Sequence, residues 1–126
     1  MAKTSKKILL VDDNDDCREM LALFIKRLGY EVLEAGTGVH AIDRASRILP
    51  DLIVMDLRLP AMNGDEATAC LKANPYTRNI PVLINSADGI SDVHKKRVLD
   101  AGASEILQKP LNLSKLPGVL NRYLPA

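Results

Sequence analysis

The run Leu52–Met55 constrains the fold of this chain more than any other stretch. It is apolar throughout, it is too short for a helix, and it lies between Pro50 and Pro60. Such a run is typical of a strand buried on both faces, as strands in parallel sheets are. The run ends on Asp56, and a buried carboxylate is costly unless something nearby uses its charge. Because open α/β sheets bind ligands at the carboxyl ends of their strands, a functional site is expected at this edge.

Four other short runs predict strands, and helical patterns separate them. The strands are expected at residues 8–11, 30–33, 81–84 and 105–108. Apolar residues at helical spacing predict helices at about 15–28, 39–49, 64–73, 90–101 and 114–124. Strict alternation of five strands with five helices predicts a single α/β domain. Its sheet should be parallel, with helices on both faces and right-handed crossovers.

The helices also carry expected ends and inward faces. Asn14 or Asp15 is expected to cap the first helix, Gly29 to end it, and Ser114 to cap the last. The inward positions are expected at Val39, Ile42, Ser46 and Leu49 in the second helix, at Ala67, Cys70 and Leu71 in the third, and at Ile90, Val93, Val98 and Ala101 in the fourth.

Composition narrows the class of protein. A length of 126 residues, with 47% hydrophobic and 26% charged residues, fits one soluble domain with a real core. The net charge of +1 gives no bias toward nucleic acid or anionic membrane. Cys17 and Cys70 lack CxxC spacing and are expected to be buried or half-buried thiols. No signal peptide or membrane-spanning run is visible, so a cytoplasmic location is expected.

Polar groups follow four of the five strands. Asp12 and Asp13 follow the first, Asp56 the third, Ser86 the fourth and Lys109 the fifth. Three carboxylates in one place repel each other, and a hard cation such as Mg²⁺ relieves that repulsion. The lysine and the hydroxyl would suit phosphoryl oxygens, and an aspartate in such a clamp can form an aspartyl phosphate. Each residue alone is ordinary loop chemistry, so the joint placement carries the prediction.

An ordered set of motifs resembles the response-regulator receiver domain, the CheY-like family of two-component signalling. The motifs are Ile8–Asp13, Val54–Leu57 with Leu59-Pro60 and Asn63-Gly64, Asn85–Ala87, and Gly102-Ala103 followed by Lys109-Pro110. The resemblance covers essentially the whole chain. It implies a flavodoxin-like fold with strand order 2-1-3-4-5. It also implies one receiver domain over residues 1–126, with an ordered core of about 6–124 and no output domain.

The resemblance implies roles for the acidic residues at the sheet edge. Asp56 is implied as the phosphoacceptor. Asp13 and Asp56 are implied as direct ligands of Mg²⁺, with Asp12 acting mainly through water. The backbone carbonyl of Arg58 would complete the protein ligands.

The same resemblance assigns the remaining chemistry to Ser86 and Lys109. Ser86 is implied as the switch hydroxyl that moves onto the phosphoryl group, and Lys109 as the cation that pairs with its oxygens. The bond from Lys109 to Pro110 is implied to be cis. With Asp56 these residues would catalyse only the protein's own phosphorylation and dephosphorylation. The implied partners are a sensor histidine kinase or histidine phosphotransfer protein and a downstream protein target, with no nucleic acid and no membrane.

One position departs from the family pattern. Ile106 stands three residues before Lys109, where the family usually has Tyr or Phe. Isoleucine has no ring and is stiff at χ1, so the aromatic readout of phosphorylation is absent. We expect the signal to pass instead through the loop before the fourth helix and a face that includes Ser91, Lys95 and Ile106.

A second feature lies at the mouth of the site. Arg58 follows Asp56 by two residues, and Asp88 follows Ser86 by two. These two side chains could form an exposed salt bridge over the phosphoryl group and limit the approach of water. An exposed pair of this kind contributes only about 0–1 kcal/mol to stability. Two ordinary surface charges would give the same sequence, so both interpretations stay open.

Three other functions are alternatives for a chain with this pattern. A haloacid-dehalogenase-like phosphatase needs a second aspartate two residues after the nucleophile, and Arg58 occupies that position. A flavodoxin-type FMN carrier needs a hydroxyl- and glycine-rich phosphate loop, whereas residues 12–16 are mostly acidic. A degenerate receiver that acts as a phosphate-independent docking module stays open because of Ile106.

Overall fold

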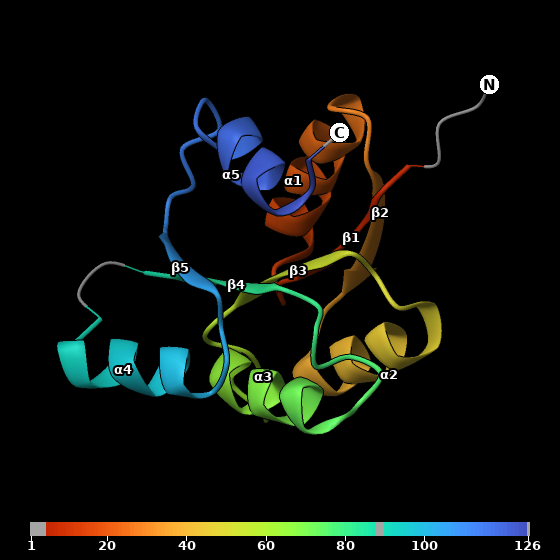
Figure 1. Ribbon diagram of the computed structural model, residues 1–126. Helices are drawn as coiled ribbons and strands as arrows, with labels where there is room; N and C mark the ends of the chain where they lie inside the picture. The colour runs from red at the N-terminus through yellow and green to blue at the C-terminus, as the bar shows by residue number, and fades with distance from the viewer. Residues whose placement is uncertain (1–4, 88–89, 126) are drawn as a thin grey trace.

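A computed structural model describes residues 5–87 and 90–125, which form five strands alternating with five helices (Figure 1). The strands are β1 (Lys7–Val11), β2 (Glu31–Ala35), β3 (Leu52–Asp56), β4 (Val82–Ser86) and β5 (Glu105–Gln108). The helices are α1 (Asp15–Arg27), α2 (Gly38–Ile48), α3 (Gly64–Ala73), α4 (Asp92–Asp100) and α5 (Leu116–Tyr123). All neighbouring strands pair in parallel, in the order β2-β1-β3-β4-β5. The predicted fold class and strand order are therefore confirmed.

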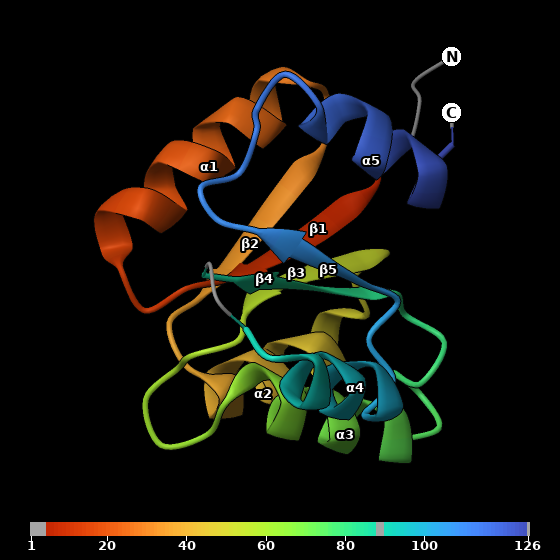
Figure 2. The same ribbon diagram turned by 90° about the vertical axis from the view of Figure 1, so that its left-hand side faces the viewer.

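The helices cover both faces of the sheet. Helices α1 and α5 lie on one face, and α2, α3 and α4 lie on the other (Figures 1 and 2). This arrangement leaves the carboxyl edge of the sheet to the loops that follow the strands. Asp12, Asp13, Asp56, Ser86 and Lys109 all lie at or next to those loops.

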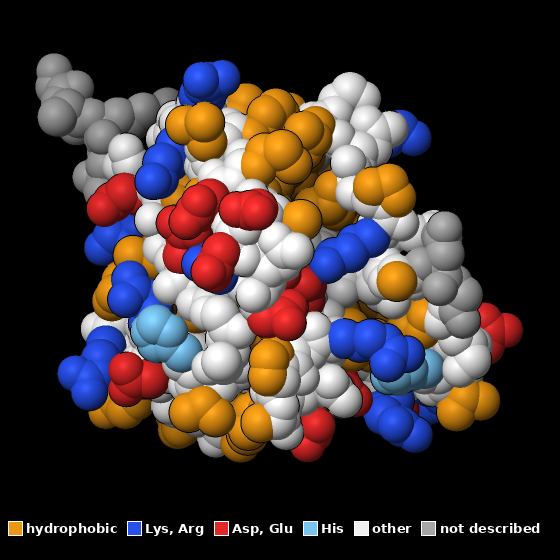
Figure 3. Space-filling model, turned by 180° about the vertical axis from the view of Figure 1, so that it is seen from behind, with side chains coloured by type: hydrophobic (Ala, Val, Ile, Leu, Met, Phe, Trp, Pro, Cys, Tyr) orange, Lys and Arg blue, Asp and Glu red, His pale blue; other side chains and the backbone are white. Residues whose placement is uncertain are grey.

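Charged side chains of both signs are mixed on the surface. On the face shown in Figure 3, acidic side chains gather near the middle, with Lys and Arg side chains close to them. This mixture fits the net charge of +1. Among the described residues, no helix has the length and apolar character needed to cross a membrane.

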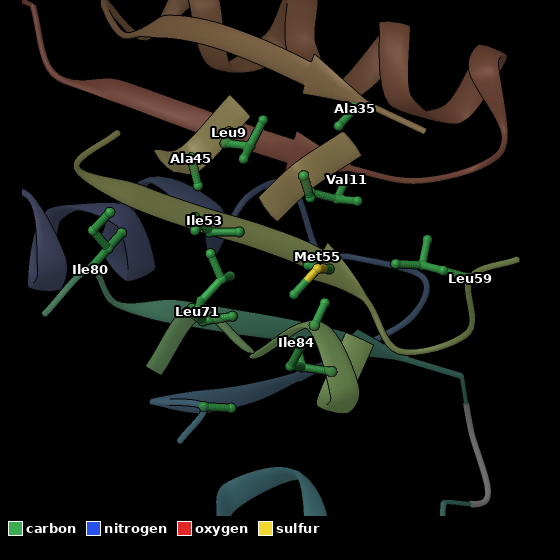
Figure 4. Packing of buried hydrophobic residues seen from close by; sticks show 14 of the residues in the cluster. Leu9, Val11, Ala35, Ala45, Ile53, Met55, Leu59, Leu71, Ile80 and Ile84 are labelled. Carbon is green, nitrogen blue, oxygen red and sulfur yellow. The ribbon is translucent and has the colours of Figure 1, made fainter. Parts of the chain in front are cut away.

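Two apolar clusters hold the helices against the sheet. Successive side chains of a strand point to opposite faces, so each strand contributes to both clusters. The cluster beneath α2, α3 and α4 takes Leu9, Val11, Ile53, Met55 and Ile84 from the sheet (Figure 4). The cluster beneath α1 and α5 takes Ile8, Leu10, Leu52, Val54 and Leu83. All five residues of β3 are buried, as the apolar run predicted.

Local sequence explains most helix ends. The side chain of Asn14 caps α1 by accepting from the Cys17 N–H at 2.9 Å, and Gly29 follows the helix with a φ of 104°. The prediction for α5 was wrong, because Lys115 rather than Ser114 precedes its first residue. The Ser114 hydroxyl instead donates to Asn112 Oδ1 at 2.6 Å and stabilises a turn before the helix.

The predicted inward face of α2 was wrong in part. Val39 and Leu49 are 62% and 46% exposed, whereas Ala41 and Ala45 are fully buried. The stripe that faces the sheet is therefore made of small residues, which let the helix pack closely. Leu49 adopts a left-handed conformation with a φ of 55°, which takes it out of the helical pattern.

The predicted inward faces of α3 and α4 are also wrong in part. Cys70 is exposed on α3, and Cys17 is exposed on α1. The prediction that both thiols are buried or half-buried is therefore wrong. On α4, Val93 is 74% exposed, while Val98 is buried and His94 is half-buried. A polar residue thus occupies the inward position one turn before Val98.

Candidate functional site

Three carboxylates converge at the carboxyl edge of the sheet. Asp12 and Asp13 follow β1, and Asp56 is the last residue of the neighbouring strand β3. Oxygen atoms of the three side chains lie within 4.8 Å of one another. Asp56 is buried, Asp12 is half-buried and Asp13 is exposed. An oxygen-lined site of this kind suits a hard divalent cation such as Mg²⁺.

A lysine pairs with the buried carboxylate from the other side. Lys109 Nζ donates to Asp56 Oδ2 at 2.7 Å and lies 4.0 Å from Asp12 Oδ2. The peptide bond between Lys109 and Pro110 is cis. The second carboxylate oxygen, Asp56 Oδ1, is buried and makes no hydrogen bond to a described residue. Lys109 therefore uses one oxygen of the Asp56 carboxylate, and the other oxygen can still bind a further group.

Burial dominates the electrostatics of Asp56. It raises the pKa of Asp56 to about 7, while the hydrogen bond from Lys109 lowers it and the neighbouring Asp12 raises it further. Burial alone would lower the pKa of Lys109, but its hydrogen bond to Asp56 and the attraction of both aspartates raise it. The site therefore holds an excess of negative charge that one lysine does not balance, and a second cation would be stabilised there.

Arg18 holds the acidic loop in place, a role that the sequence did not predict. Its Nη1 donates to the Asp12 carbonyl oxygen at 2.7 Å, its Nε to Glu34 at 3.0 Å and its Nη2 to Asp15 at 2.9 Å. The side chain is only 13% exposed. The position three residues after Asp15 was the only signal in the sequence, and it indicated a local helix pair rather than a contact with the loop.

On the other side of Asp56, a cavity of about 380 Å³ opens between β3, β4 and α4. Its wall includes Asp56, Arg58, Ser86, Ser91, His94 and Lys109. The Ser86 hydroxyl donates weakly to the Ala87 carbonyl oxygen at 3.2 Å. A hydroxyl, a lysine and an arginine therefore line the same cavity as the buried carboxylate. His94, which the sequence did not single out, lies in this wall.

Asn85 and Ile106, on the neighbouring strands β4 and β5, differ in what they contribute. Asn85 is paired in register with Asp56, is 5% exposed and has a buried Oδ1 without a hydrogen bond to a described residue. Ile106 is half-buried and packs against the apolar cluster beneath α2, α3 and α4. The proposed partner of Arg58, Asp88, lies outside the described residues, and Arg58 itself is exposed.

Comparison with known proteins matches the chain to one family. The family model "Response regulator receiver domain" matches residues 8–121. The polar-differentiation response regulator DivK of Brucella ovis is 30% identical over 120 residues, covering 95% of this chain and 97% of its own.

Solved structures agree with that match. The chemotaxis response regulator CheY4 of Vibrio cholerae superposes with a TM-score of 0.87 at 30% identity, covering 95% of this chain and 99% of that one. The receiver domain of the sensor histidine kinase PA1611 from Pseudomonas aeruginosa, solved with a magnesium ion coordinated in its active-site cleft, gives a TM-score of 0.88 at 30% identity. That comparison covers 98% of this chain and 100% of the other. With its acidic edge, its lysine and its sheet order, the chain belongs to the CheY-like family of response-regulator receiver domains.

Proposed function

We propose that this protein is a phosphorylatable receiver whose phosphoacceptor is Asp56. One observation carries the proposal: a buried aspartate has one oxygen bound to Lys109 at 2.7 Å and the other without a hydrogen bond to a described residue, beside two further carboxylates. Such a carboxylate has one oxygen available as the nucleophile, with Lys109 on one side and, on the other, an acidic site that would hold a divalent cation. The phosphodonor would be a histidine kinase or a histidine phosphotransfer protein.

The residues present fit a magnesium ion. Asp12, Asp13 and Asp56 bring their oxygens within 4.8 Å of one another, and burial raises the pKa of Asp56 to about 7 without metal. Asp13 and Asp56 would hold the ion directly, Asp12 through water, and Arg58 through its backbone carbonyl. Bound there, Mg²⁺ would neutralise charge on the oxygens of the transferring phosphoryl group.

The reaction is a transfer between two groups. A carboxylate oxygen of Asp56 forms a bond to phosphorus as the phosphorus–nitrogen bond of the donor phosphohistidine breaks. The imidazole of the donor leaves with the electron pair, and solvent supplies the proton that it gains. Lys109 follows the negative charge from the Asp56 carboxylate to the phosphoryl oxygens. In dephosphorylation, water attacks the phosphorus, the bond from phosphorus to the Asp56 oxygen breaks, and inorganic phosphate leaves while the carboxylate is regenerated. The only catalysis proposed is therefore the protein's own phosphorylation and dephosphorylation.

We further propose that output leaves through the β4–α4 loop and the face carrying Ser91, Lys95 and Ile106. Ser86 lies at the base of that loop, and its weak 3.2 Å bond to the Ala87 carbonyl leaves its hydroxyl available for a phosphoryl oxygen. Helix α4 has Val98 as its one fully buried residue, so displacing it disturbs little of the core. Hydrogen exchange before and after phosphorylation tests this, and an unchanged α4 would remove it.

The decisive test is intact-mass measurement after incubation with acetyl phosphate. We expect the wild type to gain one phosphoryl group with Mg²⁺ and none with EDTA, and Asp56→Asn to gain none. The proposed salt bridge of Arg58 with Asp88, which would limit the approach of water, is tested by the lifetime of the aspartyl phosphate in Arg58→Ala and in Asp88→Ala. Unchanged lifetimes would count against it. Absence of any gain at all Mg²⁺ concentrations would favour the alternative, a docking module that binds its partner without phosphate.

A further inference from the structure

Asn85 presents a buried polar atom that the proposed chemistry does not yet use. Its side chain is 5% exposed, and its Oδ1 makes no hydrogen bond to a described residue. A buried amide oxygen without a partner destabilises a fold, and in native proteins it usually has a use. A leucine is nearly the same size and would fill the position without that cost. The amide therefore needs an explanation.

The position of Asn85 places it beside the reacting pair. Asn85 is the register partner of Asp56 in the parallel pairing of β3 with β4. Side chains alternate along a strand, so Asn85 points to the same side of the sheet as Leu83, which packs beneath α1 and α5. By the same alternation, Asp56 follows Val54 to that side. The amide and the carboxylate are therefore neighbours across the two strands.

Lys109 shares the surroundings of Asn85. Both side chains line the 380 Å³ cavity next to Asp56, and both line a second cavity of about 520 Å³ that opens toward Asp12 and α1. With Ala87, they form the partition between the two cavities. The two residues therefore line the same two cavities.

The ammonium of Lys109 also has bonding capacity to spare. It has three N–H donors, and the hydrogen bond to Asp56 Oδ2 at 2.7 Å uses one. Asp12 Oδ2, at 4.0 Å, is too distant for a second. A neutral acceptor in the same wall can hold the ammonium without competing with a phosphoryl group for its charge.

We propose that Asn85 is a positioning residue for Lys109: its Oδ1 accepts a hydrogen bond from the ammonium when Lys109 turns from Asp56 to the phosphoryl group. The proposal rests on the phosphorylation proposed above and adds the residue that fixes the lysine during the transfer. Before phosphorylation, the Asp56 carboxylate holds the lysine through Oδ2. When the carboxylate becomes an acyl phosphate it loses that charge, and Asn85 then keeps the lysine from swinging into solvent, to which it is 39% exposed.

The test compares Asn85→Leu with the wild type in three measurements. Phosphorylation by acetyl phosphate should slow about tenfold, because a hydrogen bond to a charged group is lost. The Tm should stay equal or rise, because a buried unpaired oxygen is removed. In the Mg²⁺–beryllofluoride complex, the slowly exchanging ammonium protons of Lys109 should be visible by NMR in the wild type and absent in the variant.

The chain supplies its own controls. The ammonium of Lys72 donates to the carbonyl oxygens of Ile80 at 2.6 Å and Arg78 at 3.0 Å, so its NMR signal should persist in every sample. Asn121→Leu, on the exposed side of α5, should alter none of the three measurements. The Lys109 signal is assigned by its loss in Lys109→Arg.

The possible results test the role proposed for Asn85 as follows. A variant that is phosphorylated as fast as the wild type and keeps the Lys109 signal overturns the role of Asn85 and leaves the proposed function intact. A variant with a lowered Tm and an unchanged rate shows that the amide is only structural, and also overturns it. A wild type that takes up no phosphoryl group removes both proposals. If Asn85→Leu fails to fold, Asn85→Val gives the same three measurements with a smaller side chain.

Discussion

At the scale of single residues, Arg18 decides how firmly the acidic loop is held. Its guanidinium joins the Asp12 carbonyl oxygen to the carboxylates of Glu34 and Asp15, and 13% of the side chain is exposed. We expect Arg18→Met to lower the free energy of unfolding by about 2–3 kcal/mol, because it leaves Glu34 and a carbonyl oxygen without their charged donor. Urea unfolding measures the change. Mg²⁺ affinity should fall as well, since Asp12 loses its anchor.

The matched control for that prediction is Arg47→Met. Arg47 makes an ion pair of the same 2.9 Å length with Asp43 on α2, but its side chain is 76% exposed. Loss of this ion pair should lower the free energy of unfolding by less than about 0.5–1 kcal/mol, because water replaces an exposed partner. Equal losses for the two variants would mean that the loop contact of Arg18 adds nothing to stability.

What the sequence could predict at this scale depends on where a residue stands. The proximity of Asp12, Asp13 and Asp56 could be predicted from the sequence, because the carboxyl ends of the strands of a parallel sheet meet at one edge. Asn85 and Arg18 could not, because their importance depends on strand register and on the reach of a side chain across two elements. Burial of Asn85 and the three contacts of Arg18 exist only in the folded chain.

At the scale of elements, the start of α3 is tied to the end of β3 by a close backbone approach. A Cβ on Gly64 would overlap the carbonyl oxygen of Asp56 and lie 3.1 Å from Leu57 Cα. We expect Gly64→Ala to destabilise the protein by about 1–3 kcal/mol, because backbone atoms rather than a flexible side chain must move. Phosphorylation should slow too, since the displaced atoms carry Asp56.

Gly118 gives the opposite expectation in α5. A Cβ at Gly118 meets nothing within 4 Å, and the residue lies inside a helix. Gly118→Ala should therefore stabilise the protein by about 0.5–1 kcal/mol. Urea unfolding of the two variants side by side separates close packing from backbone entropy. A gain of stability in Gly64→Ala would contradict the account of Gly64, and a loss in Gly118→Ala would contradict that of Gly118.

Elements were easier to predict than the faces that they bury. Strand positions followed from short apolar runs: β5 has the expected ends, and β3 begins at Leu52 as expected and extends one residue past the run to include Asp56. The predicted inward faces of α2 and α4 are wrong in part because large apolar residues such as Val39 and Val93 do not lie in the core but are exposed. Hydrophobicity indicates a helix, but the depth of the space beneath it decides whether small or large residues fill that space.

At the scale of the whole molecule, Asp56 links stability to pH. Its pKa is about 7 in the folded protein, raised mainly by burial, against an ordinary value of 3.8. Between these two pH values the folded chain binds more protons than the unfolded chain, so stability falls as pH rises. The contribution is fully present below about pH 4 and is lost as pH passes through 7.

This fall in stability with rising pH predicts the stability of Asp56→Asn without divalent metal. The variant should be more stable than the wild type at pH 8 by about 1–3 kcal/mol, because a neutral amide avoids the buried charge. The difference should shrink steadily as the pH is lowered to 4. Asp43→Asn, at a side chain that is 53% exposed, should show no such trend. Adding Mg²⁺ at pH 8 should raise the Tm of the wild type and not that of Asp56→Asn, because a cation that binds only the folded protein stabilises it. A Tm difference between Asp56→Asn and wild type that stays constant from pH 4 to 8 would show that the charge of Asp56 does not limit stability.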